Sequence, residues 1–223
     1  MSDSVTRSQA TKVKTEGKAT VQTKAAPRGA RHEVRIIGGL WRRSLLPVAD
    51  RPGLRPTPDR VRETLFNWLG QDLSGWRVLD AFAGSGALGF EAASRGAAEV
   101  LLLERDPVLV DSLNASRQRL GAQALKVQRS EAMAWLRQPP APRFELILLD
   151  PPFDAELALP ALVAALPLVV PGGYVYVESA AALPAQLPAG VVVLRQSRAG
   201  AVHFALLQRS DAAAVPEPAP AAA

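Results

Sequence analysis

The sequence predicts an α/β fold with a mostly parallel sheet of seven strands, and three patterns lead to this prediction. Between residues 77 and 178, short β-rich runs alternate with helical stretches, which is typical of parallel strands joined by helices on both faces of a sheet. Two more β-rich runs follow with only Ser197–Ala201 between them, so they predict an antiparallel hairpin and a reversed last strand. A shorter unit of different character precedes the sheet, at residues 31–70.

The predicted strands are short apolar runs bounded by polar or turn-forming residues: Arg77–Phe82, Glu99–Glu104, Leu125–Gln128, Phe144–Asp150, Tyr174–Glu178, Val191–Gln196 and Val202–Gln208. The predicted helices fill the gaps between them, for example at Ser85–Arg95, Pro107–Leu120 and Glu156–Leu166. The sheet domain is therefore expected at residues 71–210. The Pro/Ala-rich segment 211–223 and the polar segment 1–30 lack apolar periodicity, and we expect both to be disordered.

The front unit at residues 31–70 predicts a small β-hairpin followed by a helix. Val34–Gly39 and Trp41–Pro47 form the two arms of the hairpin around a Gly-Gly pair. A Pro-rich connector leads to a helix over Arg60–Leu69, which Asp59 or Thr57 would cap. Helical spacing predicts one side toward the core and one away from it: Val61, Leu65, Trp68 and Leu69 inward, and Arg60, Arg62 and Glu63 outward.

Charge is distributed unevenly along the chain. The first 62 residues hold fourteen Lys/Arg and five Asp/Glu, whereas the remainder holds twelve and sixteen. A basic front on a mildly acidic body favours contact with a polyanion through the front segment. The chain has no cysteine, no secretory signal pattern and no apolar run long enough to span a bilayer, so we expect a cytoplasmic protein without disulfides.

A glycine-rich loop follows the first strand of the predicted sheet, at Asp80–Gly89. Its Gly84, Gly86 and Gly89 match the dinucleotide pattern G-x-G-x-x-G, and Glu104 ends the next strand. An acidic residue just upstream would repel a pyrophosphate, whereas it favours the sulfonium and ammonium groups of S-adenosylmethionine. We therefore expect S-adenosylmethionine at this loop, with Glu104 on the ribose hydroxyls and Glu131, after the third strand, near the adenine.

The tetrapeptide Asp150-Pro151-Pro152-Phe153 follows a strongly apolar run and is therefore expected at the carboxyl edge of a buried strand, where open α/β sheets bind ligands. A carboxylate and a backbone carbonyl here can each accept an N–H of an aromatic amino group and turn its lone pair toward a methyl donor. The prolines stiffen the loop, and Phe153 offers a face to a base that has left its stack.

The sequence offers few residues for nucleophilic or metal-dependent catalysis. The two histidines, His32 and His203, lie at the margin of the front tail and on a predicted strand. They cannot form a nucleophilic triad or a metal cluster, so we expect no metal and interpret His203 as a packing residue.

Together these motifs resemble the bacterial 16S rRNA guanine-N2 methyltransferases. Besides Asp80-x-Phe-x-Gly-Ser-Gly and Asp150-Pro-Pro-Phe, the resemblance includes Arg35-Ile-Ile-Gly-Gly-x-Trp-Arg, the long motif from Leu54 to Leu69, and Tyr176-Val-Glu. It covers about Val34 to Arg209. It implies a class I methyltransferase, Rossmann-like fold with a catalytic domain at 71–210 and an RNA-facing extension at 31–70. It also implies a monomer that methylates one guanine of 16S rRNA or of a small-subunit assembly particle.

The resemblance assigns three sets of residues. The catalytic set is Asp150, Pro151 and Phe153. The cofactor-binding set is Asp80, Phe82, Gly84, Ser85, Gly86, Glu104, Arg105, Glu131 and Ala132. The RNA-binding set is Arg35, Arg42, Arg43, Arg55, Thr57, Arg60 and Arg62.

Three other functions remain open at this stage. The same tetrapeptide chemistry serves adenine-N6 and cytosine-N4 DNA methyltransferases, although the chain has little room for a DNA-recognition domain. A non-catalytic RNA-binding protein on the same fold is a second alternative, which the intact Asp80 and Asp150 disfavour. A dinucleotide oxidoreductase is the third, and the charge at Asp80 disfavours it.

Overall fold

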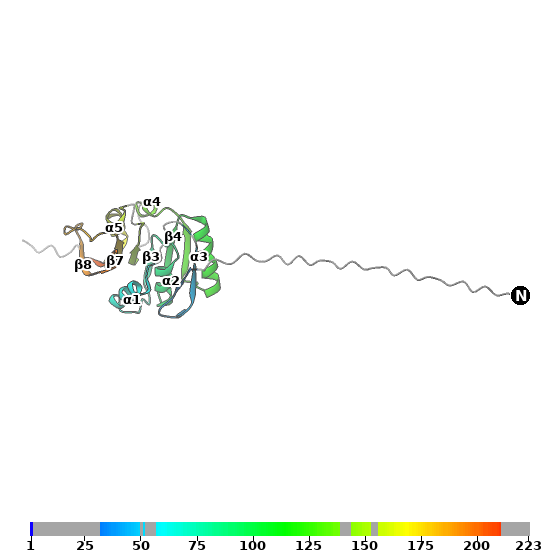
Figure 1. The fold of residues 1–223 in the computed structure, drawn as a ribbon. Coiled ribbons are helices and arrows are strands. Elements are labelled where there is room, and N and C mark those ends of the chain that lie inside the picture. Colours follow the sequence, from blue (N-terminus) through cyan, green and yellow to red (C-terminus); the bar gives the residue numbers. More distant parts are fainter. Residues whose placement is uncertain (2–31, 50, 52–56, 139–143, 153–155, 211–223) are drawn as a thin grey trace, which may run out of the picture. The chain divides into compact units, whose positions relative to one another are not determined.

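The computed structural model describes residues 1, 32–49, 51, 57–138, 144–152 and 156–210 (Figure 1). The expected tails, apart from Met1, lie outside these residues. The elements in chain order are β1 (His32–Arg35), β2 (Leu45–Val48), α1 (Asp59–Trp68), β3 (Arg77–Asp80), α2 (Ala87–Ser94), β4 (Glu99–Glu104), α3 (Pro107–Leu120), β5 (Leu125–Arg129), α4 (Ala132–Leu136), β6 (Phe144–Leu149), α5 (Ala158–Ala165), the 3-10 turn η2 (Leu166–Leu168), β7 (Val169–Ser179), β8 (Val191–Ala199) and β9 (Val202–Arg209). None of the helices described here has the length and apolarity needed to cross a bilayer.

Seven strands form one sheet in the order β5-β4-β3-β6-β7-β9-β8. The strands from β5 to β7 are parallel, whereas β9 runs antiparallel between β7 and β8. In Figure 1 the sheet extends from β8 on the left to β4 and α3 on the right. The predicted parallel sheet with a reversed last strand is confirmed, and the reversed strand lies inside the sheet, which leaves β8 at the edge.

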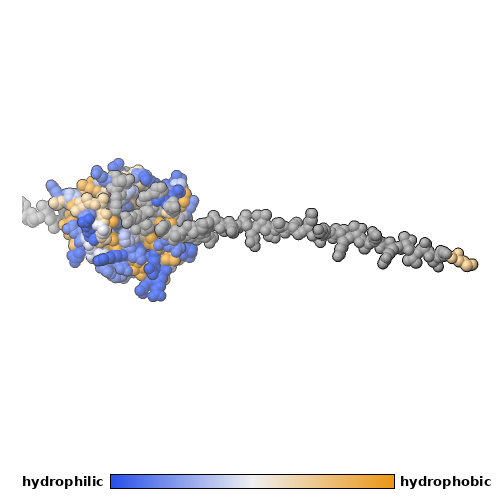
Figure 2. Space-filling view, viewed as in Figure 1, coloured by the Kyte–Doolittle hydropathy of each residue, from blue (hydrophilic) through white to orange (hydrophobic). Residues whose placement is uncertain are grey.

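The sheet is covered on both faces because alternate residues of its central strands enter two different cores. Val78 of β3 and Leu146 of β6 pack with side chains of α1, α2 and α3. Their neighbours Leu79 and Ile147 pack with side chains of α4 and α5. Continuous apolar strands of this kind are expected where a parallel sheet is buried on both sides. The face of the molecule in Figure 2 mixes hydrophilic and hydrophobic side chains, as expected where most large apolar groups are already inside.

The front unit shares a core with the sheet. β1 and β2 form the predicted antiparallel hairpin, with His32 opposite Val48. Ile36 after β1 and Leu46 on β2 are fully buried in the same core as Val78 of the sheet. The hairpin and α1 therefore cover the sheet rather than standing apart as a separate unit.

Two predictions of element ends were wrong, and one helix was missed. The N-cap residue of α1 is Pro58, without a side-chain cap, because Thr57 and Asp59 direct their side chains to other partners. β7 begins five residues before the predicted Tyr174: Val169 pairs with Phe144 of β6, and a register irregularity follows before Leu146 pairs with Tyr174. The short helix α4 was not predicted, and its N-cap is Glu131, whose carboxylate accepts the N–H groups of two helix residues.

Arg62 was expected on the outer side of α1, but it is fully buried there. The buried face of α1 consists of Val61, Arg62, Leu65 and Phe66. A pattern that counts every arginine as polar places this residue in solvent. The structure buries it because acceptors surround its guanidinium, as described below.

Candidate active site

The proposed site residues gather where parallel strands end. Asp80 ends β3, Glu104 ends β4, and Asp150 directly follows β6. Because β4, β3 and β6 are hydrogen-bonded neighbours, their carboxyl ends lie side by side. This is the edge at which open α/β sheets bind ligands. The structure therefore brings together the two motifs that the sequence separates by seventy residues.

The loop between β3 and α2 depends on its glycines. Gly84 and Gly86 have φ of +53° and +78°, a backbone region that favours glycine. A Cβ on Gly86 would lie 2.6 Å from Leu113, so a larger residue would force the loop and α3 apart. A Cβ on Gly89 would lie 2.2 Å from Leu102 of β4 and would push α2 away from the sheet. These glycines hold the backbone of the loop close to the strand ends.

Asp80 lies beneath this loop and is 1% exposed. Its Oδ2 accepts the backbone N–H of Gly89 at 3.0 Å, which ties the start of α2 to the end of β3. Burial and the nearby Asp150 carboxylate raise the pKa of Asp80 to about 7. Asp80 therefore organises the loop. Because its side chain is buried, it can affect a ligand through its electrostatic field but not through direct contact.

Glu104 holds the other side of the loop. Its Oε2 accepts the N–H of Gly84 at 3.0 Å, and its Oε1 accepts the N–H of Asp106 at 2.8 Å. Each carboxylate oxygen retains a further lone pair, and the residue is partly exposed. Glu104 can therefore bind a pair of hydroxyl groups without giving up these bonds.

Glu131 has a structural function that the sequence analysis missed. Its two carboxylate oxygens accept the N–H groups of Met133 at 2.9 Å and Ala134 at 2.6 Å, so they cap α4. Ala132, the first residue of that helix, is buried. The spacing of an acidic residue just before Ala132–Leu136 could have indicated this cap.

Asp150 is held by a residue from the front unit. Thr57 Oγ1 donates a hydrogen bond to Asp150 Oδ2 at 3.1 Å, and Thr57 is itself buried. Asp150 is partly exposed, but the surrounding protein removes water from its carboxyl group. This desolvation raises the pKa of Asp150 to about 6, while the bond from Thr57 opposes the rise. Pro151 is buried next to it. Thr57 was predicted to bind RNA; in the structure its side chain is buried and bonds to Asp150.

A second buried carboxyl group lies beside Asp150 and was not predicted as a site residue. Glu178, on β7, is 1% exposed, and Tyr176 Oη donates a hydrogen bond to its Oε1 at 2.9 Å. Burial and the charge of Asp150 raise the pKa of Glu178 to about 8. Its position was visible in the Tyr-Val-Glu motif, but nothing in the sequence pairs that motif with Asp150. Asp80, Asp150 and Glu178 together are called the carboxyl cluster below.

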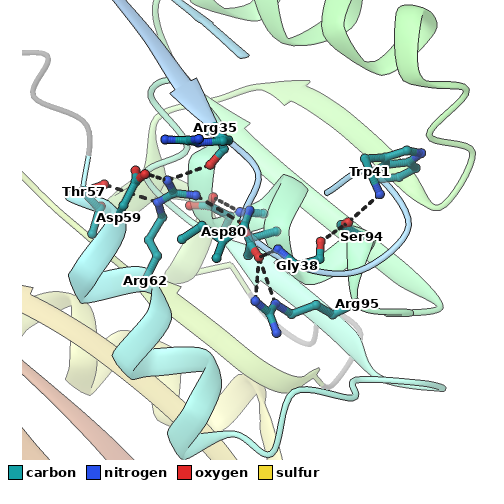
Figure 3. A network of polar contacts seen from close by, with 12 residues as sticks. Arg35, Gly38, Trp41, Thr57, Asp59, Arg62, Asp80, Ser94 and Arg95 are labelled. Atoms are coloured by element: carbon teal, nitrogen blue, oxygen red, sulfur yellow. Dashed lines mark hydrogen bonds and ion pairs between the residues drawn. The ribbon is translucent and has the colours of Figure 1, made fainter. Parts of the chain in front are cut away.

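The front unit is attached to α2 through Glu91, a fully buried residue. Figure 3 shows the polar contacts around it, with its partners Gly38, Arg62 and Arg95 labelled. Its carboxylate accepts the backbone N–H groups of Ile37 at 2.8 Å and Gly38 at 2.7 Å. It also pairs with Arg62 at 3.3 Å and with Arg95 at 2.8 Å. These residues together with Asp59, which pairs with Arg62 at 2.7 Å, are called the Glu91 network below.

Arg62 links this network to the candidate site. Its Nε donates to the backbone carbonyl of Thr57 at 3.3 Å, and its Nη2 donates to the carbonyl of Arg35 at 2.9 Å. The Glu91 network therefore fixes the backbone of Thr57, whose side chain orients Asp150. The predicted phosphate contact of Arg62 is wrong for this structure, since no part of its side chain reaches the surface.

The remaining arginines differ in position. Arg35 and Arg60 are exposed on the front unit. Arg42 and Arg43 are also exposed, but they follow Leu40 and Trp41, whose N–H groups bond to Ser94 at the C-terminal end of α2. The eight residues of α2 separate them from the glycine loop by about 12 Å of helix. Only a large substrate could contact both places. The predicted Arg55 and Phe153 lie outside the described residues.

The loop and the strand ends fit the cofactor expected from the sequence. Gly84 and Gly86 turn the backbone sharply at positive φ, and Glu104 offers acceptors for hydroxyl groups. Phe82 and Ser85 of the loop are partly exposed, and Arg105 is exposed next to Glu104. A site that surrounds buried carboxyl groups suits a cationic methyl donor better than a pyrophosphate.

Comparison with known proteins agrees with this geometry. Residues 34–208 match the family described as Conserved hypothetical protein 95. The chain is 41% identical to the ribosomal RNA small subunit methyltransferase D of Haemophilus influenzae over 184 residues, 80% of this chain and 95% of that one. It is 43% identical to the protein of the same name from Escherichia coli strain K12 over 185 residues, 79% and 90% of the two chains.

Solved structures show the same fold. The Escherichia coli protein yhhF, described as a methyltransferase, superposes with a TM-score of 0.73 at 39% identity, over 80% of this chain and 99% of that one. A methylase from Haemophilus influenzae gives a TM-score of 0.70 at 37% identity, over 81% and 100% of the two chains. The chain therefore has the class I methyltransferase fold and belongs to the Conserved hypothetical protein 95 family, together with the ribosomal RNA small subunit methyltransferase D proteins.

Proposed function

We propose that this protein transfers a methyl group from S-adenosylmethionine to the exocyclic N2 of one guanine in small-subunit ribosomal RNA. The observation that carries the proposal is the Asp150 carboxylate, oriented by Thr57 at the strand edge that also holds the glycine loop. The names of the relatives, which are small-subunit rRNA methyltransferases, support the choice of substrate.

Asp150 and the backbone after it would prepare the amino group for reaction. The lone pair of an aromatic amine is delocalised into the ring, so the amine is a weak nucleophile. Hydrogen bonds from its two N–H groups to the Asp150 carboxylate and to the carbonyl of Pro151 would draw the nitrogen toward tetrahedral geometry. These acceptors are fixed before the substrate binds, which is where electrostatic preorganisation is most effective. S-adenosylmethionine bound at the glycine loop would supply the methyl group on a positively charged sulfur, and the guanine nitrogen would accept it as the sulfur becomes a neutral thioether.

The same carboxylate can take up the proton that the nitrogen loses after transfer. A pKa raised to about 6 by burial leaves Asp150 mostly ionised at neutral pH and a better proton acceptor than an exposed aspartate. Gly84, Gly86 and Glu104 would hold the cofactor from its other side, with the segment at Glu131 and Ala132 near its adenine. None of these steps requires a metal ion.

In this proposal the front unit at residues 31–70 and the sheet domain at 71–210 have different functions. Exposed arginines of the front unit, such as Arg35 and Arg60, would contact RNA phosphates, whereas the sheet edge carries the reaction. The buried Arg62 would act on neither directly, but it keeps Thr57 in place.

The experiment is methyl transfer with labelled S-adenosylmethionine to 16S rRNA, to small-subunit particles and to duplex DNA, followed by digestion and identification of the labelled nucleoside. We expect N2-methylguanosine from RNA. Label in N6-methyladenosine or N4-methylcytidine would overturn the choice of amino group, and label in DNA alone would overturn the choice of substrate. Binding of RNA without transfer to any substrate would favour a non-catalytic RNA-binding protein.

A further inference from the structure

A second hollow lies at the same end of the sheet as Asp150, two strands away. It has a volume of about 270 Å³ and lies over β7, β9 and β8. Eight residues of these strands line it, and six of them lie in two rows across the strands: Val177, Ser179, Gln196, Arg198, His203 and Ala205. Nothing in the proposed methyl transfer uses them. The volume is slightly below that of typical small-molecule sites and suits one flat heterocycle.

Strand register explains why these side chains share a wall. His203 on β9 pairs with Ser179 on β7 and with Arg198 on β8, so these three form one row across the sheet. Ala205 pairs in the same way with Val177 and Gln196, two residues further along each strand. Residues two apart on a strand point to the same face. The wall is therefore polar near the hairpin tip and mostly apolar deeper in.

The other wall comes from the segment after β7. Ala182 and Leu183 line the hollow there, and Leu183 packs against the core on the α5 side of the sheet. An apolar interior with donors and acceptors at its mouth matches a nucleobase, which has apolar faces and polar edges. Recognition of unpaired RNA bases uses this combination of packing and edge hydrogen bonds.

Charge at this end of the chain favours an anionic ligand. From Ser179 to Ser210 the sequence holds three arginines and no Asp or Glu, although the chain beyond residue 62 is acidic as a whole. Arg198 is exposed, and its Nε donates to the carbonyl of Gly200 at 2.7 Å, which orients its guanidinium at the hairpin tip. Among the described ion pairs none involves Arg198. Its remaining donors suit a phosphate.

We propose that this hollow binds the unpaired nucleotide next to the target guanine, with the base between β9 and Leu183 and its phosphate on Arg198. The proposal rests on the function proposed above. β9 is two strands from β6, about 10 Å at the usual strand spacing. Asp150 faces α1, whereas the hollow opens on the α5 face. An RNA strand crossing the end of β7 would thus place successive nucleotides on the two sides of the sheet edge.

The test uses the full chain with S-adenosylmethionine and a single-stranded oligoribonucleotide from the methylated region of 16S rRNA. Arg198→Ala and His203→Gln are compared with Arg195→Ala, which removes an exposed arginine of β8 that does not line the hollow. We expect Arg198→Ala to weaken RNA binding about tenfold and to reduce the slope of log affinity against log salt by about 0.7, as for one lost phosphate contact. His203→Gln should weaken binding less, and Arg195→Ala should leave both quantities close to those of the wild type.

Photochemical crosslinking locates the nucleotide directly. RNA carrying 4-thiouridine beside the target guanine should crosslink to the peptide 179–205. Equal affinities for Arg198→Ala and Arg195→Ala, or crosslinks confined to other peptides, would overturn the proposal. Binding and crosslinking can be measured without methyl transfer. If Arg198→Ala weakens RNA binding but the wild-type protein methylates no RNA, the result contradicts the proposed function and not the proposed role of the hollow. Methylation of RNA without any Arg198 effect would contradict the hollow alone.

Discussion

Among the described residues, the Glu91 network and the carboxyl cluster both contain buried carboxyl groups, namely Glu91 in the first and Asp80 and Glu178 in the second. The two groups differ in whether opposite charge accompanies the acids. In the Glu91 network one carboxylate meets two guanidinium groups and two backbone N–H groups. In the carboxyl cluster three acids share a site, and none of them takes part in a described ion pair. Their pKa values are raised because burial disfavours the charged forms, and the charge of Asp150 adds to the rise for Asp80 and Glu178.

This difference in charge balance indicates a structural role for the Glu91 network and a functional role for the carboxyl cluster. A balanced buried network is stable in one arrangement and holds elements together, here the front hairpin and α1 on α2. An unbalanced cluster of acids stores unfavourable electrostatic energy, which is typical of functional sites. Thr57 connects the two, since Arg62 holds its backbone and its side chain binds Asp150.

The largest expected effect comes from unbalancing the network. Glu91→Gln keeps the size of the side chain but leaves two buried guanidinium groups without their carboxylate. We expect it to lower the free energy of unfolding by about 3–5 kcal/mol, measured by urea denaturation. Glu33→Gln, at an exposed position of β1, serves as the control and should change little. Equal stability of the two variants would show that the network does not anchor the front unit.

Removal of the reactive carboxylate should act on turnover instead. We expect Asp150→Ala to reduce methyl transfer on the order of 10²–10³-fold, because one preorganised acceptor is lost. Cofactor binding, measured by calorimetry, should stay near the wild-type value. Asp111→Ala, at an exposed position of α3, should keep full activity. Transfer at a near wild-type rate in Asp150→Ala would disprove the assigned role.

The carboxyl cluster should make stability depend on pH. The pKa of Glu178 is raised in the folded state to about 8, so its contribution to stability is present below the unfolded pKa near 4.5 and is lost as pH rises through about 8. We therefore expect the wild-type free energy of unfolding to fall between pH 5 and pH 8. Glu178→Gln, which mimics the neutral acid, should fall less over this range, whereas the exposed Glu63→Gln should follow the wild type.

Glu178→Gln also tests how the methyl-transfer rate depends on pH, because Asp150 and Glu178 should affect the rate in different pH ranges. Transfer needs ionised Asp150, so activity should rise with pH through about 6 in both proteins. Ionisation of Glu178 beside Asp150 near pH 8 should alter the wild-type rate and leave Glu178→Gln unaffected. Identical profiles above pH 7 would mean that Glu178 does not influence the reaction.

The smallest effect is expected for an exposed arginine of the front unit. Arg60→Ala should reduce the dependence of RNA affinity on salt by about one phosphate contact, without a change in thermal stability. Arg62→Ala, two residues along the same helix, should instead destabilise the fold because it removes buried pairing to Glu91 and Asp59. The reverse pattern, with Arg62 acting on RNA alone, would contradict the buried position of its side chain.

Much of the fold could be predicted from the sequence. The alternation of apolar strands and helices, together with the final hairpin, predicted the seven-stranded sheet, and β4 and α3 have the predicted bounds. The short helix α4 was missed because five residues give too little periodicity to detect. The true start of β7 was missed because Pro171 and the two glycines after it resemble a turn.

For the site, the sequence by itself pointed to the motifs at Asp80 and Asp150, and only the tertiary structure decided which other groups contact them. The tetrapeptide at Asp150 and the glycine loop at Asp80 are local patterns, so they can be recognised along the chain. The pairing of Thr57 with Asp150 and of Arg62 with Glu91 joins residues 93 and 29 positions apart. Such contacts depend on packing between elements, so the sequence alone placed Thr57 and Arg62 on RNA, whereas in the structure Thr57 bonds to Asp150 and Arg62 bonds to Thr57.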